Sequence, residues 1–195
     1  MWAPVSKERA GRLPFDTLRR VAPRDFRTRL NRRASKAGLF LAEDLSARLT
    51  AYYELLSRWN RKINLTSIVD PDDAIDRLLL EPLLAARHVP PDVSHLLDVG
   101  SGGGSPGIPL KLALPRVALT MVEVKIRKSA FLREAVRHLE LRGVTVEAGR
   151  YEELLARPEL HETFDVVSQG RRSSHSREPN AHAASRQLAA LFCCG

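Results

Sequence analysis

Residues 96–110 read LLDVGSGGGSPGIPL, and this stretch decides the fold of the chain. Its apolar start is typical of the end of a buried strand, and five glycines follow within eight residues. Because glycine has no Cβ, a ligand can come close to the backbone of such a turn. Pro109 suits the first turn of a helix over residues 108–114, whose free amides would point at the ligand. The stretch therefore predicts a strand, a glycine turn and a helix that bind a nucleotide-like ligand.

The glycines fit two patterns, G-x-G-x-G counted from Gly100 and G-x-G-x-x-G counted from Gly102. The second pattern is the dinucleotide-binding fingerprint. A turn glycine belongs directly after the strand, which favours the count from Gly100 and makes Ser105 the third fingerprint position. We expect Gly100, Gly102, Gly104 and Ser105 to line the ligand site.

Two carboxylates narrow the choice of ligand. Asp98 lies inside the apolar strand, where burial is costly unless a donor such as an amino group pairs with it. Glu123 lies 23 residues beyond Gly100, where related folds place an acid on the ribose hydroxyls. This pair fits S-adenosylmethionine better than NAD. A dinucleotide-binding Rossmann module remains an alternative, as does a purely structural glycine turn with two surface acids.

The pattern beyond the glycine turn alternates strands with helices. Strands are predicted over residues 117–122, 144–148 and 164–168, with a second crossover helix over residues 126–141. This alternation indicates an α/β Rossmann-like domain over residues 91–168, with about four parallel strands and right-handed crossovers. The ligand site then lies at the carboxyl ends of the strands.

Residues 24–90 predict a helical region before the cofactor domain. Apolar and aromatic residues recur in steps of three and four over residues 43–59, which indicates an amphipathic helix whose stripe packs in the core. Asp70 followed by Pro71 is a strong start signal for another helix. Pro82 is expected to kink that helix.

The chain resembles the RsmG (GidB) family of methyltransferases, which modify N7 of a guanine in 16S ribosomal RNA. The resemblance covers roughly residues 26–168 and rests on motifs in a fixed order: NLTSI, LLDVGSGGGSPGIPL, MVEVKIRKSAFLREA, EAGRYEEL and FDVVS. It implies a class I fold, S-adenosylmethionine as cofactor and a cytoplasmic enzyme. It also implies that Glu123 binds the ribose, and that Tyr151 and Glu152 meet the adenine, Tyr151 replacing the family's usual alanine.

The implied chemistry explains why no general base stands out in the sequence. Guanine N7 carries a lone pair and no proton, so the enzyme has only to align the nucleophile with the methyl group and exclude water. The resemblance predicts an arginine after the fourth strand, but Gln169 occupies that position. The catalytic residues therefore stay unknown, and a cofactor-binding remnant without turnover is an alternative function.

Both ends of the chain differ from its middle. Residues 1–23 are basic and lack a sustained apolar period, so we expect disorder there. Residues 169–195 read as an aberrant tail in which only residues 188–191 could form a helical turn. Losing one base after Ser168 could restore a Ser-Arg-Ala sequence, which suggests a frameshift.

Charge and cysteine usage bear on partners and compartment. The net charge is +8 over residues 1–36, −3 over residues 37–168 and +3 over residues 169–195. The basic stretch 24–36 could lie on RNA phosphates, consistent with 16S rRNA or the small ribosomal subunit as partner. No apolar run is long enough for a membrane span, no histidine or cysteine spacing predicts a metal site, and we expect a monomer.

Overall fold

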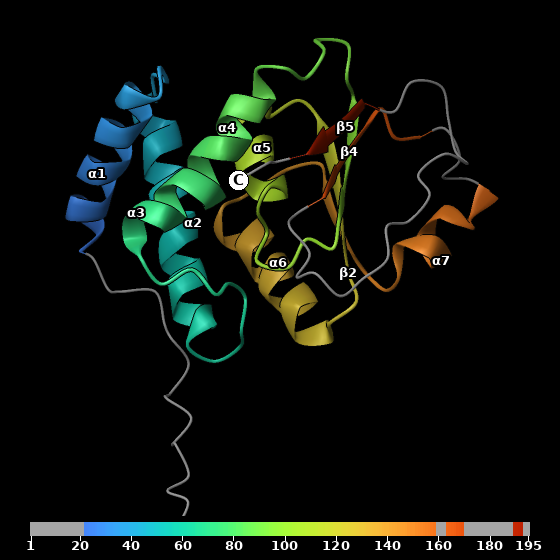
Figure 1. Ribbon diagram of the computed structural model, residues 1–195. Coiled ribbons are helices and arrows are strands. Elements are labelled where there is room, and N and C mark those ends of the chain that lie inside the picture. The colour runs from blue at the N-terminus through green and yellow to red at the C-terminus, as the bar shows by residue number, and fades with distance from the viewer. Residues whose placement is uncertain (1–21, 159–162, 170–188, 193–195) are drawn as a thin grey trace, which may run out of the picture.

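The computed structural model describes residues 22–158, 163–169 and 189–192. Its centre is a parallel sheet with the strand order β3-β2-β1-β4-β5 (Figure 1). The strands are β1 (His95–Val99), β2 (Ala118–Glu123), β3 (Val144–Ala148), β4 (Val166–Gln169) and β5 (Ala189–Phe192). The predicted α/β class with a parallel Rossmann-like sheet is confirmed.

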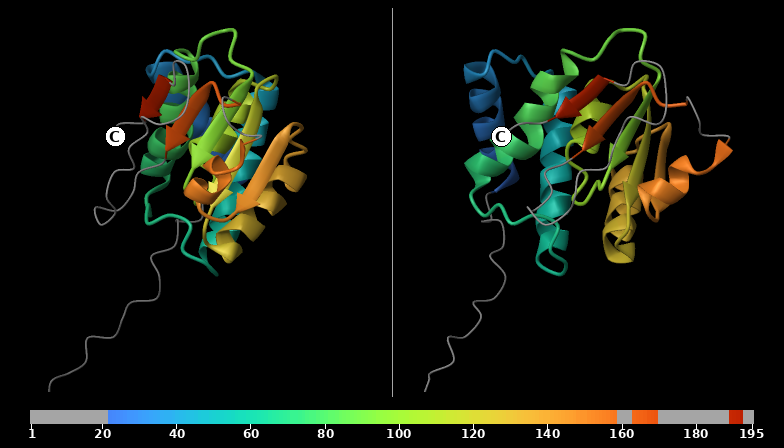
Figure 2. Two further views of the ribbon diagram at one scale, coloured as in Figure 1. Left: turned by 90° about the vertical axis from the view of Figure 1, so that its right-hand side faces the viewer. Right: turned by 45° about the vertical axis from the view of Figure 1, so that its right-hand side comes forward.

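Helices cover both faces of this sheet. They are α1 (Pro23–Lys36), α2 (Glu43–Asn60), α3 (Pro71–Ala74), the π-helical segment η1 (Ile75–Leu80), α4 (Glu81–Ala86), α5 (Gly107–Ala113), α6 (Ile126–His138) and α7 (Tyr151–Leu155). Figure 2 shows α7 on one face of the sheet and the other helices on the opposite face. The domain therefore has three layers.

The two layers of helices bury alternate residues of the strands. Leu96 and Met121 belong to the large core that α1, α2, η1, α5 and α6 share. Leu97 and Val122 face the other way and pack with Leu154 of α7 in a second, smaller core. This alternation follows from the period of two along a strand.

The tail contributes a strand that the sequence analysis did not predict. Residues 189–192 form β5, which pairs in parallel with β4 and places Ala189 beside Val166. The expectation of an unstructured tail with at most a helical turn is wrong for these four residues, and the sheet has five strands instead of about four. The expectation is also wrong at Pro23, which begins α1, and at Gln169, which ends β4. Residues 1–21, 170–188 and 193–195, where disorder was also expected, lie outside the described residues.

A kink was expected at Pro82, and the irregularity that the structure shows is the π-helical segment η1, which ends two residues before this proline. Proline has no N–H, so Pro82 cannot donate to the carbonyl of Leu78 four residues earlier. The helix widens into a π-helical turn just before Pro82, and the Ser105 hydroxyl donates to the Leu78 carbonyl over 2.9 Å. A proline in the helical region thus creates an acceptor that holds the glycine turn.

Ion pairs join α1 to the segment that contains α3 and η1. The Arg33 guanidinium donates to Asp76 and, over 3.3 Å, to Asp72. Its side chain is 30% exposed, so solvent only partly screens the pairs.

We expect Arg33→Ala to lower the free energy of unfolding by about 1 kcal/mol at low salt, and by less in 1 M NaCl. Urea unfolding of both proteins at two salt concentrations measures this. Arg32→Ala is the matched control, because Arg32 is exposed and makes no ion pair among the described residues. If both variants lose the same free energy of unfolding, the ion pairs of Arg33 do not contribute to stability.

Candidate functional site

The strand order reverses next to β1. The chain runs outward from β1 to β2 and β3, and then returns to place β4 on the other side of β1. In open parallel sheets, ligands bind at such a switch point, beyond the carboxyl ends of the strands. The glycine turn, residues 100–107, follows β1 at this point, and Glu123 ends the neighbouring strand.

The backbone of the glycine turn is closed by its own hydrogen bonds. The Gly104 N–H donates to the Ser101 carbonyl over 2.6 Å, and the Gly104 carbonyl accepts from the Ile108 N–H over 2.7 Å. Gly104 has φ = +88°, and a Cβ there would lie 2.5 Å from Ile108 Cδ1. Only glycine fits this position without strain.

Glu123 supports the glycine turn from β2. Its carboxylate accepts the Gly102 N–H on Oε2 and the Lys125 N–H on Oε1, each over 2.9 Å. The side chain is buried, with both oxygens already bonded to the backbone. Each carboxylate oxygen can accept a further hydrogen bond, so this role is compatible with the predicted contact to ribose hydroxyls.

Asp98 is the most unusual group of the site. Its side chain is completely buried, and Oδ1 accepts from the Ser168 hydroxyl over 2.8 Å. Oδ2 has no hydrogen-bond partner of good geometry among the described residues. Burial raises the pKa of Asp98 to about 6, with the charge of Glu123 acting in the same direction and hydrogen bonds from Ser168, Ser101 and the Gly107 amide opposing it. A buried acceptor that lacks a well-aligned donor is costly, so it favours a ligand or water that donates.

The other predicted site residues lie in the glycine turn or at the start of α7, and they differ in their contacts and exposure. Ser105 turns its hydroxyl away to the Leu78 carbonyl, so contact with a ligand through its backbone stays a prediction. Tyr151 begins α7 and packs half-buried against the smaller core, while Glu152 is exposed. The Gly149 N–H donates to the Glu123 carbonyl over 3.2 Å and brings the turn before α7 to the end of β2.

Sequence reasoning missed two residues that hold the site. Ser168 supplies the hydroxyl for Asp98, and its place in the strand beside β1 was the available signal. Tyr52 of α2 donates its hydroxyl to the Gly103 carbonyl over 2.6 Å. Its helical spacing predicted only a core residue.

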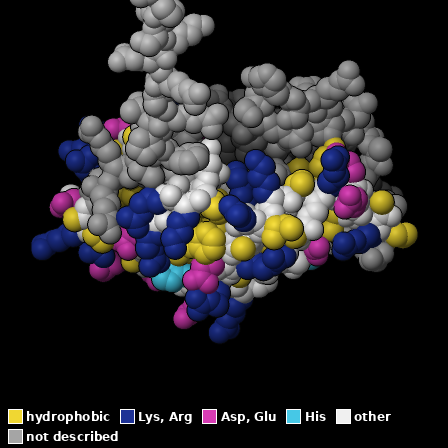
Figure 3. Space-filling view, turned by 90° about the horizontal axis from the view of Figure 1, so that it is seen from below, with side chains coloured by type: hydrophobic (Ala, Val, Ile, Leu, Met, Phe, Trp, Pro, Cys, Tyr) yellow, Lys and Arg dark blue, Asp and Glu magenta, His cyan; other side chains and the backbone are white. Residues whose placement is uncertain are grey.

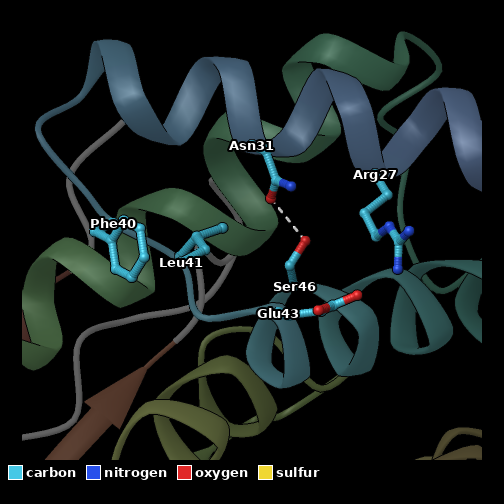
Figure 4. Close-up of a pocket in the computed structure, with 6 residues that line it drawn as sticks. All are labelled: Arg27, Asn31, Phe40, Leu41, Glu43 and Ser46. Atoms are coloured by element: carbon cyan, nitrogen blue, oxygen red, sulfur yellow. Dashed lines mark hydrogen bonds between the residues drawn. The ribbon is translucent and has the colours of Figure 1, made fainter.

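The end of the molecule where α2 finishes and α6 begins carries many Lys and Arg side chains around apolar ones (Figure 3). Lys125 and Arg127 at the start of α6 are exposed, as is Ile126 between them. A separate cavity of about 310 Å³ lies between α1 and α2 (Figure 4). None of the predicted site residues lines it: its walls are Arg27, Asn31, Phe40, Leu41, Glu43 and Ser46.

The described helices are all too short or too polar to span a lipid bilayer.

A parallel sheet with a glycine turn after β1 and an acid at the end of β2 defines a Rossmann-like cofactor-binding protein. The chain belongs to the rRNA small subunit methyltransferase G (GidB) family, whose model matches residues 45–173.

Curated relatives named ribosomal RNA small subunit methyltransferase G agree with this family. The protein of Neisseria meningitidis serogroup C is 41% identical over 124 residues, which are 64% of this chain and 59% of the relative. That of Ralstonia nicotianae is 42% identical over 137 residues, 67% of this chain and 61% of the relative. That of Xylella fastidiosa (strain M23) is 48% identical over 106 residues, 54% and 49% of the two chains. The chain thus spans about half to three fifths of the length of these relatives.

Proposed function

We propose that the glycine turn binds S-adenosylmethionine, and that the chain forms the cofactor-binding part of an enzyme that methylates N7 of a guanine in 16S rRNA. Family membership supports this activity. The observation that carries the cofactor assignment is Oδ2 of Asp98, which is buried beside Gly107 of the glycine turn and has no hydrogen bond of good geometry among the described residues. A carboxylate there suits the cofactor's amino group, which donates either directly or through a water molecule.

The other site residues would share the remaining parts of the cofactor. Glu123 offers its free lone pairs to the two ribose hydroxyls, and the backbone of Gly100, Gly102, Gly104 and Ser105 leaves room for the ligand. Tyr151 and Glu152 stand at the start of α7, where an adenine ring would lie beside the end of β2. Glu123 is buried, and its carboxylate accepts hydrogen bonds from two backbone amides. These contacts fix the carboxylate before any ligand arrives.

The bound cofactor supplies an electrophilic methyl group on a positively charged sulfur. The protein's task is to hold this methyl group in line with the guanine N7 and to exclude water, since N7 has no proton to remove. We assign no catalytic residue. Gln169, which ends β4 and pairs with Val99 of β1, stands where the family resemblance predicts an arginine.

The proposed partner is 16S rRNA, free or in the small subunit, with the protein acting as a monomer in the cytoplasm. Arg24, Arg27 and Arg32 on α1 are exposed and make no ion pair within the described part of the chain. They are available to RNA phosphates, which would add salt-dependent affinity without sequence preference.

The activity is tested by transfer of a tritiated methyl group from S-adenosylmethionine to small-subunit rRNA. Digestion of the product should yield labelled 7-methylguanosine. We expect low activity from this chain and at least 100-fold more from a version with Arg at position 169 followed by the relatives' remaining sequence, because small misplacements cost about that factor. Label in another nucleoside would contradict the proposed reaction. If both versions bind the cofactor but neither transfers the methyl group, the result would favour the alternative function, a cofactor-binding remnant without turnover.

A further inference from the structure

Tyr52 connects the helical layer to the middle of the glycine turn. It lies on α2, its side chain is completely buried, and its hydroxyl donates to the Gly103 carbonyl over 2.6 Å. Gly103 rests directly on the helical layer, because a Cβ there would lie 3.1 Å from Leu56 Cδ1 and 3.4 Å from the Leu65 carbonyl oxygen. The glycine turn is therefore built partly on residues outside the Rossmann-like domain.

The hydrogen bond acts on the peptide unit between Gly103 and Gly104. Before this unit, Glu123 holds the Gly102 N–H over 2.9 Å. Within the unit itself, the Gly104 N–H donates to the Ser101 carbonyl over 2.6 Å. The Gly103–Gly104 peptide joins two residues without side chains, so the φ and ψ angles on both sides of it are restricted less than those of other residues. Tyr52 holds the carbonyl of this unit and Ser101 holds its N–H, in the opposite directions that peptide planarity requires.

We propose that Tyr52 is a positioning residue of the cofactor site, whose hydroxyl holds the Gly103–Gly104 peptide in the orientation that the ligand requires. This inference rests on the proposed function, because the ligand is taken to be S-adenosylmethionine or its demethylated product. A turn held before binding loses less conformational freedom when the ligand arrives, which strengthens binding. On this account α2 is part of the cofactor site, although none of its residues need touch the ligand.

Tyr53 provides a matched control on the same helix. It is also buried, and its ring stacks on Phe26 with centroids 3.8 Å apart. Its hydroxyl has no hydrogen-bond partner of good geometry among the described residues. Both Tyr52→Phe and Tyr53→Phe remove one buried hydroxyl, but only the first removes a bond to the glycine turn.

The test is calorimetric titration of S-adenosylhomocysteine into the wild type and both variants, with Tm measured for each. Net hydrogen-bond energies predict a Kd about 3- to 10-fold higher for Tyr52→Phe and less than 2-fold changed for Tyr53→Phe. The Gly103 and Gly104 amide signals in nitrogen-15 NMR should shift or broaden only in Tyr52→Phe, and the Tm values separate a loss of affinity from a general loss of stability. Equal affinities, or unchanged glycine signals, in Tyr52→Phe would overturn the inference.

Two outcomes separate this inference from the proposed function. If the wild type does not bind S-adenosylhomocysteine, the proposed function fails and the positioning role fails with it. If Tyr52→Phe does not fold, the wild-type chain labelled with 3-fluorotyrosine replaces it. The fluorine signal of Tyr52 should then move on addition of S-adenosylhomocysteine while that of Tyr53 stays in place, and a stationary Tyr52 signal would overturn the inference.

Discussion

Asp98→Asn is expected to stabilise the unliganded protein at pH 7.5 and to abolish most of its affinity for the cofactor. The variant gains stability because the wild type keeps the Asp98 carboxylate fully buried. This burial raises the pKa of Asp98 from 3.8 to about 6. A shift of this size corresponds to a cost of at most about 3 kcal/mol when the group is ionised. Asparagine has the same shape, and the Ser168 hydroxyl can reverse its hydrogen bond to suit the amide.

The sign of the pH dependence follows from the raised pKa. Between about pH 4 and pH 6 the folded protein keeps a proton on Asp98 that the unfolded chain has lost. The free energy of unfolding therefore falls as the pH rises through this window, and the Asp98 contribution is constant above it. Asp165 acts in the opposite direction, because backbone hydrogen bonds from Ser94 and His95 lower its pKa, but it does so equally in both proteins.

Urea unfolding of the wild type and Asp98→Asn at pH 4.5 and pH 7.5 measures the effect. The variant should be more stable by about 1–3 kcal/mol at pH 7.5 and by only about a third of that difference at pH 4.5. A variant that is less stable than the wild type at pH 7.5 would contradict the account of a costly buried charge.

The same variant should bind the cofactor at least about 10-fold more weakly, because hydrogen bonds to a charged group are worth about 1.5–3 kcal/mol. For the same reason, binding to the wild type should weaken as the pH falls below about 6. Asp165→Asn is the control: it lies at the amino end of the sheet, where Asp165 accepts the Ser94 and His95 amides. It should lower stability and leave the affinity unchanged.

Gly107→Ala is expected to cost about 3 kcal/mol of stability and to eliminate cofactor binding. A Cβ at this position would lie 2.7 Å from Asp98 Oδ2 and 3.1 Å from Asp98 Cγ. Neither partner can move freely, because Asp98 is bonded to Ser168 and Gly107 is buried at the start of α5. Gly102→Ala is the control, since its Cβ would meet nothing closer than the Gly100 carbonyl oxygen at 3.6 Å.

Urea unfolding of both glycine variants tests this prediction. Gly102→Ala should lose about 1 kcal/mol through its φ of +54° alone. The double variant Asp98→Ala with Gly107→Ala should recover part of the loss, because it removes the clashing carboxylate. Equal losses in the two single variants, with no recovery in the double variant, would show that the contact with Asp98 is not the cause.

The sequence predicted those parts of the fold that depend on local patterns. The strand over residues 144–148 agrees with β3 at both ends, and Asp70 caps α3 through the Asp72 and Asp73 amides, as its position before Pro71 predicted. The parallel order could be inferred from the alternation of strands and helices. The glycine turn and Glu123 were brought together as expected, through the Gly102 amide.

The contacts that sequence reasoning missed connect residues far apart in the chain. Ser168 reaches Asp98 across 70 positions, and Tyr52 reaches Gly103 across 51. Ser105 could not be expected to turn toward Leu78, because that contact depends on Pro82, which cannot donate to the Leu78 carbonyl, and on how the helical region packs. β5 was missed because its four residues have no polar alternation to mark a strand, and only the edge of β4 gives them a partner.

Calorimetric titration of the chain with S-adenosylhomocysteine and, separately, with NAD is the most direct test of the proposed cofactor. We expect saturable binding of S-adenosylhomocysteine at one site, greatly weakened by Asp98→Asn, and no binding of NAD under the same conditions. Tight binding of NAD together with no response to S-adenosylhomocysteine would contradict it.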